Sequence, residues 1–247
     1  MSLDGKLTVV TDDPGGLGLG IARELARNGA TVIITSRNKS NLIKVCNLID
    51  KNCYGFQLNV SKKRSLVKFI ENISKDFSNI DILINNAGFP LEWKIWLKNV
   101  HDISEVELMN IIQVDLIGFF RVTREIIKLM MKKRSGVIIN IPPTPAISGH
   151  ICGSPYSIAK AELGSLTKHI ALEYGQYNIR SYSVALGDVY TNTMRRSPSR
   201  NELVKAKNEN KMKILGRPEE VVKVFVSSSG ENFSFSTGNT IILDGVK

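Results

Sequence analysis

The amino-acid sequence predicts a single α/β domain, in which a sheet of parallel strands is covered by helices on both faces. Short apolar runs alternate along the chain with longer segments of helical periodicity, which is the order that parallel strands and crossover helices require. The strand-like runs are continuously hydrophobic, as expected of strands with both faces buried. The 247 residues contain no linker-like segment and no internal repeat, so one domain over residues 1–247 accounts for the chain.

The apolar runs are the predicted strands, and the first directly follows a polar start. The fourth ends in a run of polar residues, and the last lies close to the end of the chain. In chain order, the predicted strands are Leu7–Thr11, Thr31–Thr35, Tyr54–Val60, Ile80–Asn85, Gly136–Ile141, Arg180–Ala185 and Thr240–Leu243.

The segments between these runs have the spacing of amphipathic helices. The predicted helices are Gly18–Asn28, Ser40–Lys51, Lys62–Phe77, Val106–Lys133, Pro155–Tyr177 and Pro218–Ser228. Residues 190–217 fit no strand and only a modest helix. In an open α/β sheet this segment would overhang the carboxyl ends of the strands, where ligands bind. We therefore expect a substrate lid there.

Composition excludes several other classes of protein. Hydrophobic residues make up 43%, charged residues 23%, and the mean hydropathy is −0.04, far from the range of disordered chains. The chain starts without the features of a signal peptide, and no apolar stretch is long enough to span a bilayer. Cys46, Cys53 and Cys152 lack a metal-binding spacing and are interpreted as reduced thiols. We expect a globular, cytoplasmic protein with no membrane partner.

The formal charge of +10 and the pI near 9.5 raise the question of an acidic partner. The densest basic stretch lies between Arg195 and Arg217, where eight Lys or Arg residues meet only Glu202 and Glu209. A solvated surface is the favoured interpretation, because charge runs usually lie on the surface. A nucleic-acid partner stays the weaker alternative, because the sequence has no recognisable readout motif.

A glycine-rich turn follows the first predicted strand. Glycines occupy positions 15, 16, 18 and 20 within Thr11–Ala26, where the turn opens a helix. Such a turn lets the backbone approach a pyrophosphate, whose charge is met by the amides of the helix N-terminus. Gly16, Leu17 and Gly18 are the expected contacts. By itself this motif is a weak signal.

Two further motifs complete a recognisable pattern. The sequence NNAG at Asn85–Gly88 closes the fourth strand, and YSIAK at Tyr156–Lys160 opens the fifth helix. In this order and at these separations, the three motifs make the chain resemble the short-chain dehydrogenase/reductase family over essentially its whole length. The resemblance implies a Rossmann-type, doubly wound parallel sheet in three α/β/α layers. It also implies an oxidoreductase that uses NAD(P)(H) to reduce a carbonyl or oxidise a secondary alcohol.

Tyr156 and Lys160 are four residues apart on a predicted helix and so share one face. An ammonium group near a phenol lowers the phenol's pKa toward working pH, as a general acid or base requires. In isolation the pair could be an ordinary amphipathic pair. Beside the other two motifs, the resemblance implies that Tyr156 exchanges a proton with the substrate oxygen, while Lys160 holds the nicotinamide ribose.

The end of the second strand bears on the cofactor. An acidic residue there would bind the ribose hydroxyls of NAD, whereas an Arg accommodates the 2′-phosphate of NADP. Ser36 occupies the acidic position and Arg37 follows. Arg37 could also be an ordinary surface residue, but the pair favours NADP(H) over NAD. The resemblance adds further cofactor contacts at Asn59, Val60, Asn86, Ala87, Gly88, Val189 and Thr191, besides Tyr156 and Lys160.

Three positions depart from the family pattern. In the glycine-rich turn, Asp12 stands where the family has glycine. Its carboxylate would weaken cofactor binding if it faced the pyrophosphate, and it could instead face solvent. At the position of an asparagine in the family's proton relay stands Asp115. Its charge could pair with Lys160, which would make Lys160 less effective in lowering the pKa of Tyr156.

The third departure concerns the substrate oxygen. Thirteen residues before the tyrosine, the family has a serine that donates a hydrogen bond to that oxygen, and this chain has Pro143. Proline has neither a hydroxyl nor a backbone N–H. Thr144 supplies a hydroxyl one residue later, but neighbours in an extended segment point to opposite sides, so it could substitute only in a rearranged chain.

These departures leave two main interpretations of function. One is an NADP-dependent oxidoreductase of impaired activity, acting on a small carbonyl or alcohol substrate, which the basic lid could favour as an anion. The other is a cofactor-binding regulator or structural partner that has lost most catalysis. The resemblance also implies a homotetramer or homodimer formed by helices 106–133 and 155–177, with Ile126, Leu129 and Met130 covered by symmetry mates.

Overall fold

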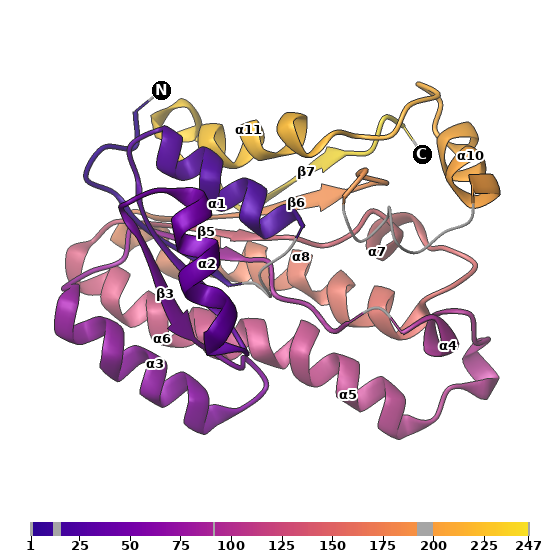
Figure 1. Cartoon of the computed structure of the whole chain (residues 1–247), viewed down its shortest axis with the longest axis horizontal. Coiled ribbons are helices and arrows are strands. Elements are labelled where there is room, and N and C mark those ends of the chain that lie inside the picture. The colour runs from indigo at the N-terminus through magenta and orange to yellow at the C-terminus, as the bar shows by residue number, and fades with distance from the viewer. Residues whose placement is uncertain (1, 12–15, 91, 192–199, 247) are drawn as a thin grey trace.

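Seven parallel strands form the centre of the molecule in the order β3-β2-β1-β4-β5-β6-β7 (Figure 1). The structure, a computed structural model, describes residues 2–11, 16–90, 92–191 and 200–246. All neighbouring strands pair in parallel, so their carboxyl ends share one edge of the sheet. The strands are β1 (Leu7–Thr11), β2 (Thr31–Ser36), β3 (Cys53–Gln57), β4 (Ile82–Asn85), β5 (Gly136–Asn140), β6 (Ile179–Leu186) and β7 (Asn239–Leu243). The predicted doubly wound α/β domain is confirmed.

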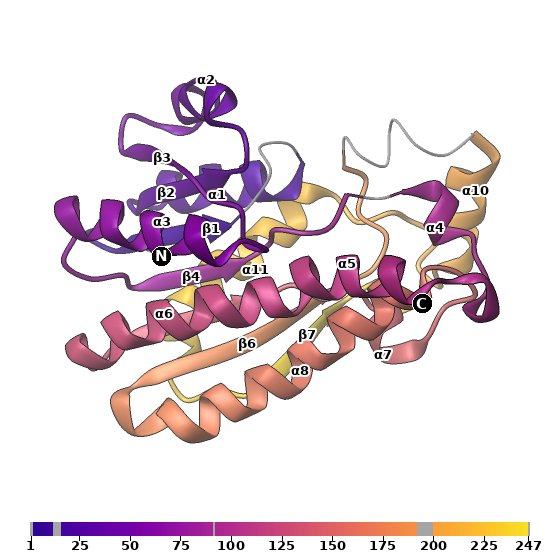
Figure 2. The ribbon, with the colours of Figure 1, turned by 90° about the horizontal axis from the view of Figure 1, so that it is seen from below.

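Helices cover both faces of the sheet (Figures 1 and 2). One face carries α1 (Leu17–Arg27), α2 (Lys39–Ile49) and α11 (Pro218–Ser229), and the other carries α3 (Lys63–Asp76), α6 (Ile117–Lys133) and α8 (Ser154–Tyr174). The remaining helices are α4 (Trp93–Trp96), α5 (Glu105–Asp115), α7 (Pro145–Ser148) and α10 (Arg200–Glu209), with 3₁₀ turns η1 (Val100–Asp102), η2 (Gly175–Tyr177) and η3 (Glu231–Phe233).

Two apolar cores lie between these layers, because alternate residues of each strand point to opposite faces. Val10 and Ile34 pack with Phe225 of α11 on one face. Val9 and Ile33 pack with Ile126 of α6 on the other. Because both faces of the strands are buried, the strand sequences are continuously apolar. The same burial on both faces specifies the register of the sheet.

The long helix expected over Val106–Lys133 is wrong as one element, since α5 ends at Asp115 and α6 begins at Ile117. Leu116 between them has φ −120° and ψ −63°. Just beyond the break, Gly118 packs so closely on Val60 that an added Cβ would lie 2.8 Å from its Cγ2. The N–H of Leu116 donates to the carbonyl of Ile112, and the N–H of Phe120 donates to the carbonyl of Leu116. Because these helical hydrogen bonds continue on both sides of the break, the sequence keeps its helical periodicity there and does not indicate two helices.

The expected strand Tyr54–Val60 is also too long, because β3 ends at Gln57. Asn59 instead begins a turn in which its Oδ1 accepts hydrogen bonds from the backbone and hydroxyl of Ser61. Within the predicted lid, α10 is the modest helix that the sequence indicated. Residues 192–199, and Asp12 in the glycine-rich turn, lie outside the described residues.

The residues named for the oligomer contact are wrong. Ile126 and Met130 are fully buried against the chain's own sheet, and Leu129 packs on the same core. Apolar residues that are exposed on α5 and α8 include Val106, Met109 and Leu172.

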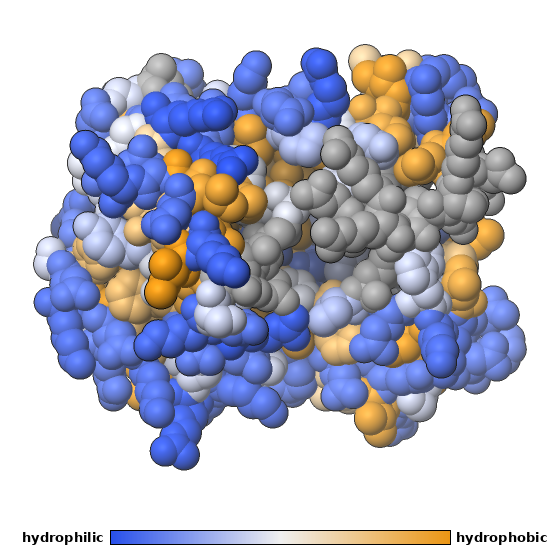
Figure 3. Space-filling view, viewed as in Figure 1, coloured by the Kyte–Doolittle hydropathy of each residue, from blue (hydrophilic) through white to orange (hydrophobic). Residues whose placement is uncertain are grey.

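The surface of the face seen in Figure 3 is mostly hydrophilic, with apolar residues gathered in separate patches. Among the described residues, no helix combines the length and the apolar character needed to span a membrane.

Candidate active site

The site is built at the carboxyl edge of the sheet, where β1 and β4 lie side by side. Thr11, the last residue of β1, is buried, and its hydroxyl donates to the carbonyl of Ile84 over 3.3 Å. The same oxygen accepts from the backbone N–H groups of Asn86 at 3.1 Å and Ala87 at 3.3 Å. Thr11 therefore fixes the NNAG segment beside the carboxyl end of β1.

A buried chain of polar side chains attaches α8 to this edge. Asn85 Nδ2 donates to Asn140 Oδ1 over 2.9 Å and to Thr123 Oγ1 over 2.8 Å. Asn140 Nδ2 in turn donates to Thr167 Oγ1 of α8 over 2.9 Å. Because buried polar groups without partners are costly, this chain specifies one position of α8 against β4 and β5. Tyr156 and Lys160 are carried by that helix.

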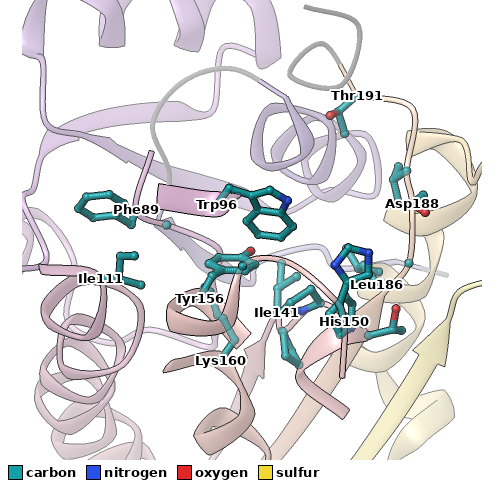
Figure 4. Close-up of a pocket in the computed structure, with 18 of the residues that line it drawn as sticks. Phe89, Trp96, Ile111, Ile141, His150, Tyr156, Lys160, Leu186, Asp188 and Thr191 are labelled. Atoms are coloured by element: carbon teal, nitrogen blue, oxygen red, sulfur yellow. The ribbon is translucent and has the colours of Figure 1, made fainter. Parts of the chain in front are cut away.

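A cavity of about 570 Å³ opens at the same edge (Figure 4). Tyr156 and Lys160 both line it, one helical turn apart. Several of the predicted cofactor positions line it as well, namely Leu17, Asn86, Gly88, Val189 and Thr191. Gly16 and Gly18 adjoin Leu17 at the start of α1, and Ala87 lies between two lining residues. The fold thus brings the predicted catalytic and nicotinamide-side residues together around one space.

The start of α1 fits the pyrophosphate of a dinucleotide. Gly16 precedes the helix with φ +93°, a conformation that side-chain-bearing residues rarely adopt. Within the described part of the chain, which omits residues 12–15, no side chain caps the helix, and its first turn contains no acidic residue. The amides of this first turn therefore retain the capacity to bind an anion.

The remaining predicted cofactor residues lie away from this cavity, at the carboxyl ends of β2 and β3. Ser36 is buried, and its hydroxyl oxygen accepts from the N–H of Asn38 over 3.1 Å. Arg37 is exposed, and its carbonyl accepts from Gln57 Nε2 over 2.9 Å. Asn59 and Val60 follow β3. None of these four is among the described residues that line the cavity, so they could only meet the adenosine half of a dinucleotide.

Lys160 and Asp115 form a buried ion pair beside the cavity. Lys160 Nζ lies 3.5 Å from Asp115 Oδ1, and the two side chains are 2% and 0% exposed. The same oxygen accepts from the N–H of Phe89 over 3.0 Å. Asp115 Oδ2 is buried and has no hydrogen-bond partner among the described residues. The pairing considered from the sequence is therefore present.

The electrostatics of this cluster differ from the sequence expectation. Burial raises the pKa of the Asp115 carboxyl and lowers the pKa of the Lys160 ammonium, because both charged forms lose hydration. Burial and the negative charge of Asp115 raise the pKa of the Tyr156 phenol above its ordinary value. The expectation that Lys160 lowers the pKa of Tyr156 is thus wrong for the protein alone, because burial of the phenol and, after it, the negative charge of Asp115 raise that pKa.

Trp96 and His150 are site residues that the sequence analysis missed. The rings of Trp96 and Tyr156 are 5.9 Å apart, and those of Trp96 and His150 are 6.2 Å apart, as Figure 4 shows. Gly153 fixes Trp96 there: it donates to the Trp96 carbonyl over 2.9 Å, and an added Cβ would lie 2.4 Å from the indole. The one signal was the paired tryptophans in Trp93–Trp96, which no motif explained.

The segment at the position of the family's serine also borders the cavity. Pro143 and Thr144 are both lining residues. The N–H of Thr144 donates to the carbonyl of Leu186 over 2.8 Å. Its hydroxyl is buried and has no hydrogen-bond partner among the described residues. Pro143 leaves the family's donor position without a hydroxyl, while an unengaged hydroxyl lies one residue further on.

The fold and this site together define the class of dinucleotide-dependent oxidoreductases with a tyrosine–lysine pair. Comparison with known proteins agrees: the family described as short chain dehydrogenase matches residues 6–202. The chain therefore belongs to the short-chain dehydrogenase/reductase family, whose members are oxidoreductases that use NAD(P).

Curated relatives and solved structures extend over nearly the whole chain. The 3-oxoacyl-(acyl-carrier-protein) reductase FabG of Aquifex aeolicus is 32% identical, covering 99% of this chain and 98% of its own. The enzyme of that name from Salmonella typhimurium is 30% identical with the same coverage. The crystal structure of a 3-oxoacyl-(acyl-carrier protein) reductase from Brucella melitensis has a TM-score of 0.92 at 25% identity, covering 99% of this chain and 91% of that one.

Proposed function

We propose that this protein is an NADPH-dependent ketone reductase, in which Tyr156 donates the proton to the carbonyl oxygen. The observation that carries the proposal is the cavity shared by Tyr156, Lys160 and the predicted nicotinamide-side residues. A raised phenol pKa keeps Tyr156 protonated over the ordinary pH range, and a protonated phenol is the form that can act as an acid.

Each residue then has a defined part in the reaction. The amides at the start of α1, with Asn86 and Gly88, would hold the dinucleotide, and Lys160 would meet its nicotinamide ribose. When bound, the cofactor supplies the hydride that reduces the carbonyl carbon. Trp96 lies next to Tyr156 and would exclude water from the reacting carbonyl. Val189 and Thr191 also line the cavity.

The proposed substrate is a neutral ketone in an apolar surrounding, such as a 3-oxoacyl thioester, the substrate type in the names of the relatives. Phe89, Ile111 and Trp96 supply apolar walls. The described lining also contains Glu92 and Glu209, and its Lys160 is already paired with Asp115. The lining therefore does not support the expectation of a substrate that carries an anionic group next to its carbonyl. We place the reaction in the cytoplasm, as the sequence suggested.

The experiment is NADPH oxidation, followed by absorbance, with a small 3-oxoacyl thioester and a simple ketone. Tyr156→Phe should lower kcat by about 100-fold or more, the usual contribution of a general acid. Calorimetry should show that Tyr156→Phe still binds NADPH. Equal rates for the two proteins would rule out Tyr156 as the proton donor.

A second candidate is a cofactor-binding protein with little catalysis, and Pro143 is the observation that favours it. Loss of one donor to the reacting oxygen costs about 100-fold or more in rate. If Pro143 limits the reaction, Pro143→Ser should raise kcat about 100-fold and Thr144→Val should have no effect. If the natural protein is fast and Thr144→Val is slow, the Thr144 hydroxyl has taken over the serine's part. NADPH binding without turnover in the natural protein and in Pro143→Ser would favour the second candidate.

A further inference from the structure

Two of the three cysteines lie against each other at the edge of the sheet. Cys46 is on α2 and Cys53 begins β3, and their Sγ atoms are 3.0 Å apart. Both are half-buried free thiols. An S–S bond is about 2.05 Å long, so the two sulfurs need to approach by only about 1 Å to be joined.

The backbone between the two cysteines holds them in this position. The N–H of Asp50 donates to the carbonyl of Cys46, and the N–H of Cys53 donates to the carbonyl of Asp50, both over 3.2 Å. The Asp50 carboxylate also accepts from the N–H of Asn52 over 3.0 Å. The turn is thus closed by three hydrogen bonds, and formation of a disulfide needs no rearrangement of the fold.

A glycine on β3 allows α2 to come this close. A Cβ at Gly55 would lie 2.7 Å from the Cβ of Leu42 and 3.3 Å from the Sγ of Cys46. The first distance is too short for two carbon atoms, so a side chain at this position would push α2 away from the strand. Because Gly55 has no side chain, Cys46 can lie beside Cys53.

The two thiols differ in their chemistry. Cys53 donates its S–H hydrogen bond to the sulfur of Cys46, which lowers the pKa of the Cys46 thiol. The same hydrogen bond and, after it, burial raise the pKa of the Cys53 thiol. Since the thiolate is the nucleophile in thiol–disulfide exchange, Cys46 is the thiol that reacts first.

We propose that Cys46 and Cys53 form a redox modification site, which a small-molecule disulfide such as glutathione disulfide converts reversibly into an intramolecular disulfide. The Cys46 thiolate attacks one sulfur of the reagent, forming a mixed disulfide and releasing one glutathione thiolate. Cys53 loses its proton to solvent and attacks the Cys46 sulfur, which releases the second glutathione. Two protein thiols are oxidised and one glutathione disulfide is reduced to two thiols.

The site is independent of the proposed reductase reaction, because neither cysteine lines the cavity. It is also separate from the residues expected to hold adenosine, because Cys53 pairs with Val32 at the amino end of β3, whereas Ser36 pairs with Gln57 at the carboxyl end. Reversible disulfides of this kind are the ones found in reducing compartments.

The test is oxidation of the full-length protein with glutathione disulfide, alkylation of the remaining thiols, and peptide mass spectrometry without reduction. The expected result is a Cys46–Cys53 linked peptide that disappears on treatment with dithiothreitol, with Cys152 alkylated. Alkylation of both Cys46 and Cys53 after oxidation, or accumulation of the mixed disulfide in the natural protein, would overturn the proposal.

Matched variants complete the test. Cys152→Ser should form the linked peptide as the natural protein does, whereas Cys53→Ser should stop at the mixed disulfide on Cys46. Gly55→Ala should cross-link several-fold more slowly, because its side chain separates α2 from β3. An unchanged rate in Gly55→Ala, with an unchanged circular dichroism spectrum, would count against the stated geometry.

Discussion

At the scale of single residues, the feature that sets this site apart is the carboxylate of Asp115. It faces Lys160 over 3.5 Å with both side chains excluded from water. Wherever the shared proton resides, the pair carries no net charge, so Tyr156 lies next to a neutral pair instead of a free ammonium. This arrangement favours a protonated tyrosine, which is the form that the proposed carbonyl reduction requires.

Asp115→Asn should therefore lower the pKa of Tyr156, because it removes the negative charge that helps to raise that pKa. Reduction requires the protonated phenol, so its rate should begin to fall at a lower pH than in the natural protein. Alcohol oxidation requires the phenolate and should reach its plateau at a correspondingly lower pH. The measurement is the pH dependence of kcat/KM in both directions. An unchanged profile would mean that Asp115 has no electrostatic influence on the tyrosine.

Arg37 is the residue on which the cofactor preference is expected to depend. It is exposed at the carboxyl end of β2, next to the buried Ser36. The natural protein should bind NADPH more tightly than NADH, and Arg37→Ala should abolish the difference by removing a charge-assisted contact to the 2′-phosphate. Lys44→Ala, which removes an exposed charge elsewhere on α2, is the control. Equal affinities in the natural protein, measured by calorimetry, would refute the assignment.

At the scale of elements, the junction of α5 and α6 connects the two halves of the site. Asp115 ends α5, and Gly118 near the start of α6 packs on Val60, which lies three residues beyond β3 and is expected to meet the cofactor. The break thus places a carboxylate against Lys160 while keeping the next turn in contact with the end of β3.

Gly118→Ala should destabilise the protein by about 1–3 kcal/mol, the usual cost of overpacking a close contact. Gly164→Ala on α8 is the matched control, because no atom lies within 4 Å of its Cβ. It should stabilise the protein by about 0.5–1 kcal/mol through its higher helix propensity. Urea denaturation measures both effects. If the two variants are equally stable, the contact with Val60 is not tight in solution.

At the scale of the whole molecule, the helices cover both faces of the sheet, but some apolar side chains of these helices remain exposed on the surface. Val106 on α5 is 69% exposed and Leu172 on α8 is 82% exposed. Covering such residues is a common reason for symmetric association. The homotetramer or homodimer expected from the family resemblance therefore stays a prediction. We now expect Val106 and Leu172 to form the contact between subunits.

Sedimentation velocity at micromolar concentration should show a dimer or tetramer of the 27.4 kDa chain. Val106→Lys combined with Leu172→Lys should shift the distribution toward the monomer, because buried unpaired charges oppose association. Ile43→Lys, at a residue that is 72% exposed on α2, should leave the distribution unchanged. A monomeric natural protein would contradict the prediction.

The sequence by itself determined the order of the strands and helices, the parallel sheet, and the tyrosine–lysine pair. These features depend on local periodicity and short motifs, which a single chain displays directly. The positions of Gly16, Asn86 and Tyr156 around one edge of the sheet followed from the topology of parallel strands.

Only the tertiary structure decided the rest, because those features depend on residues far apart in the chain. Asp115 and Lys160 are 45 positions apart and pair in the interior. Burial of the Tyr156 phenol, together with the charge of Asp115, reverses the expected shift in the pKa of Tyr156. The place of Trp96 beside the tyrosine depends on Gly153, and the contact of Cys46 with Cys53 depends on the missing side chain of Gly55. Burial and close packing set these properties, and neither is encoded in local spacing.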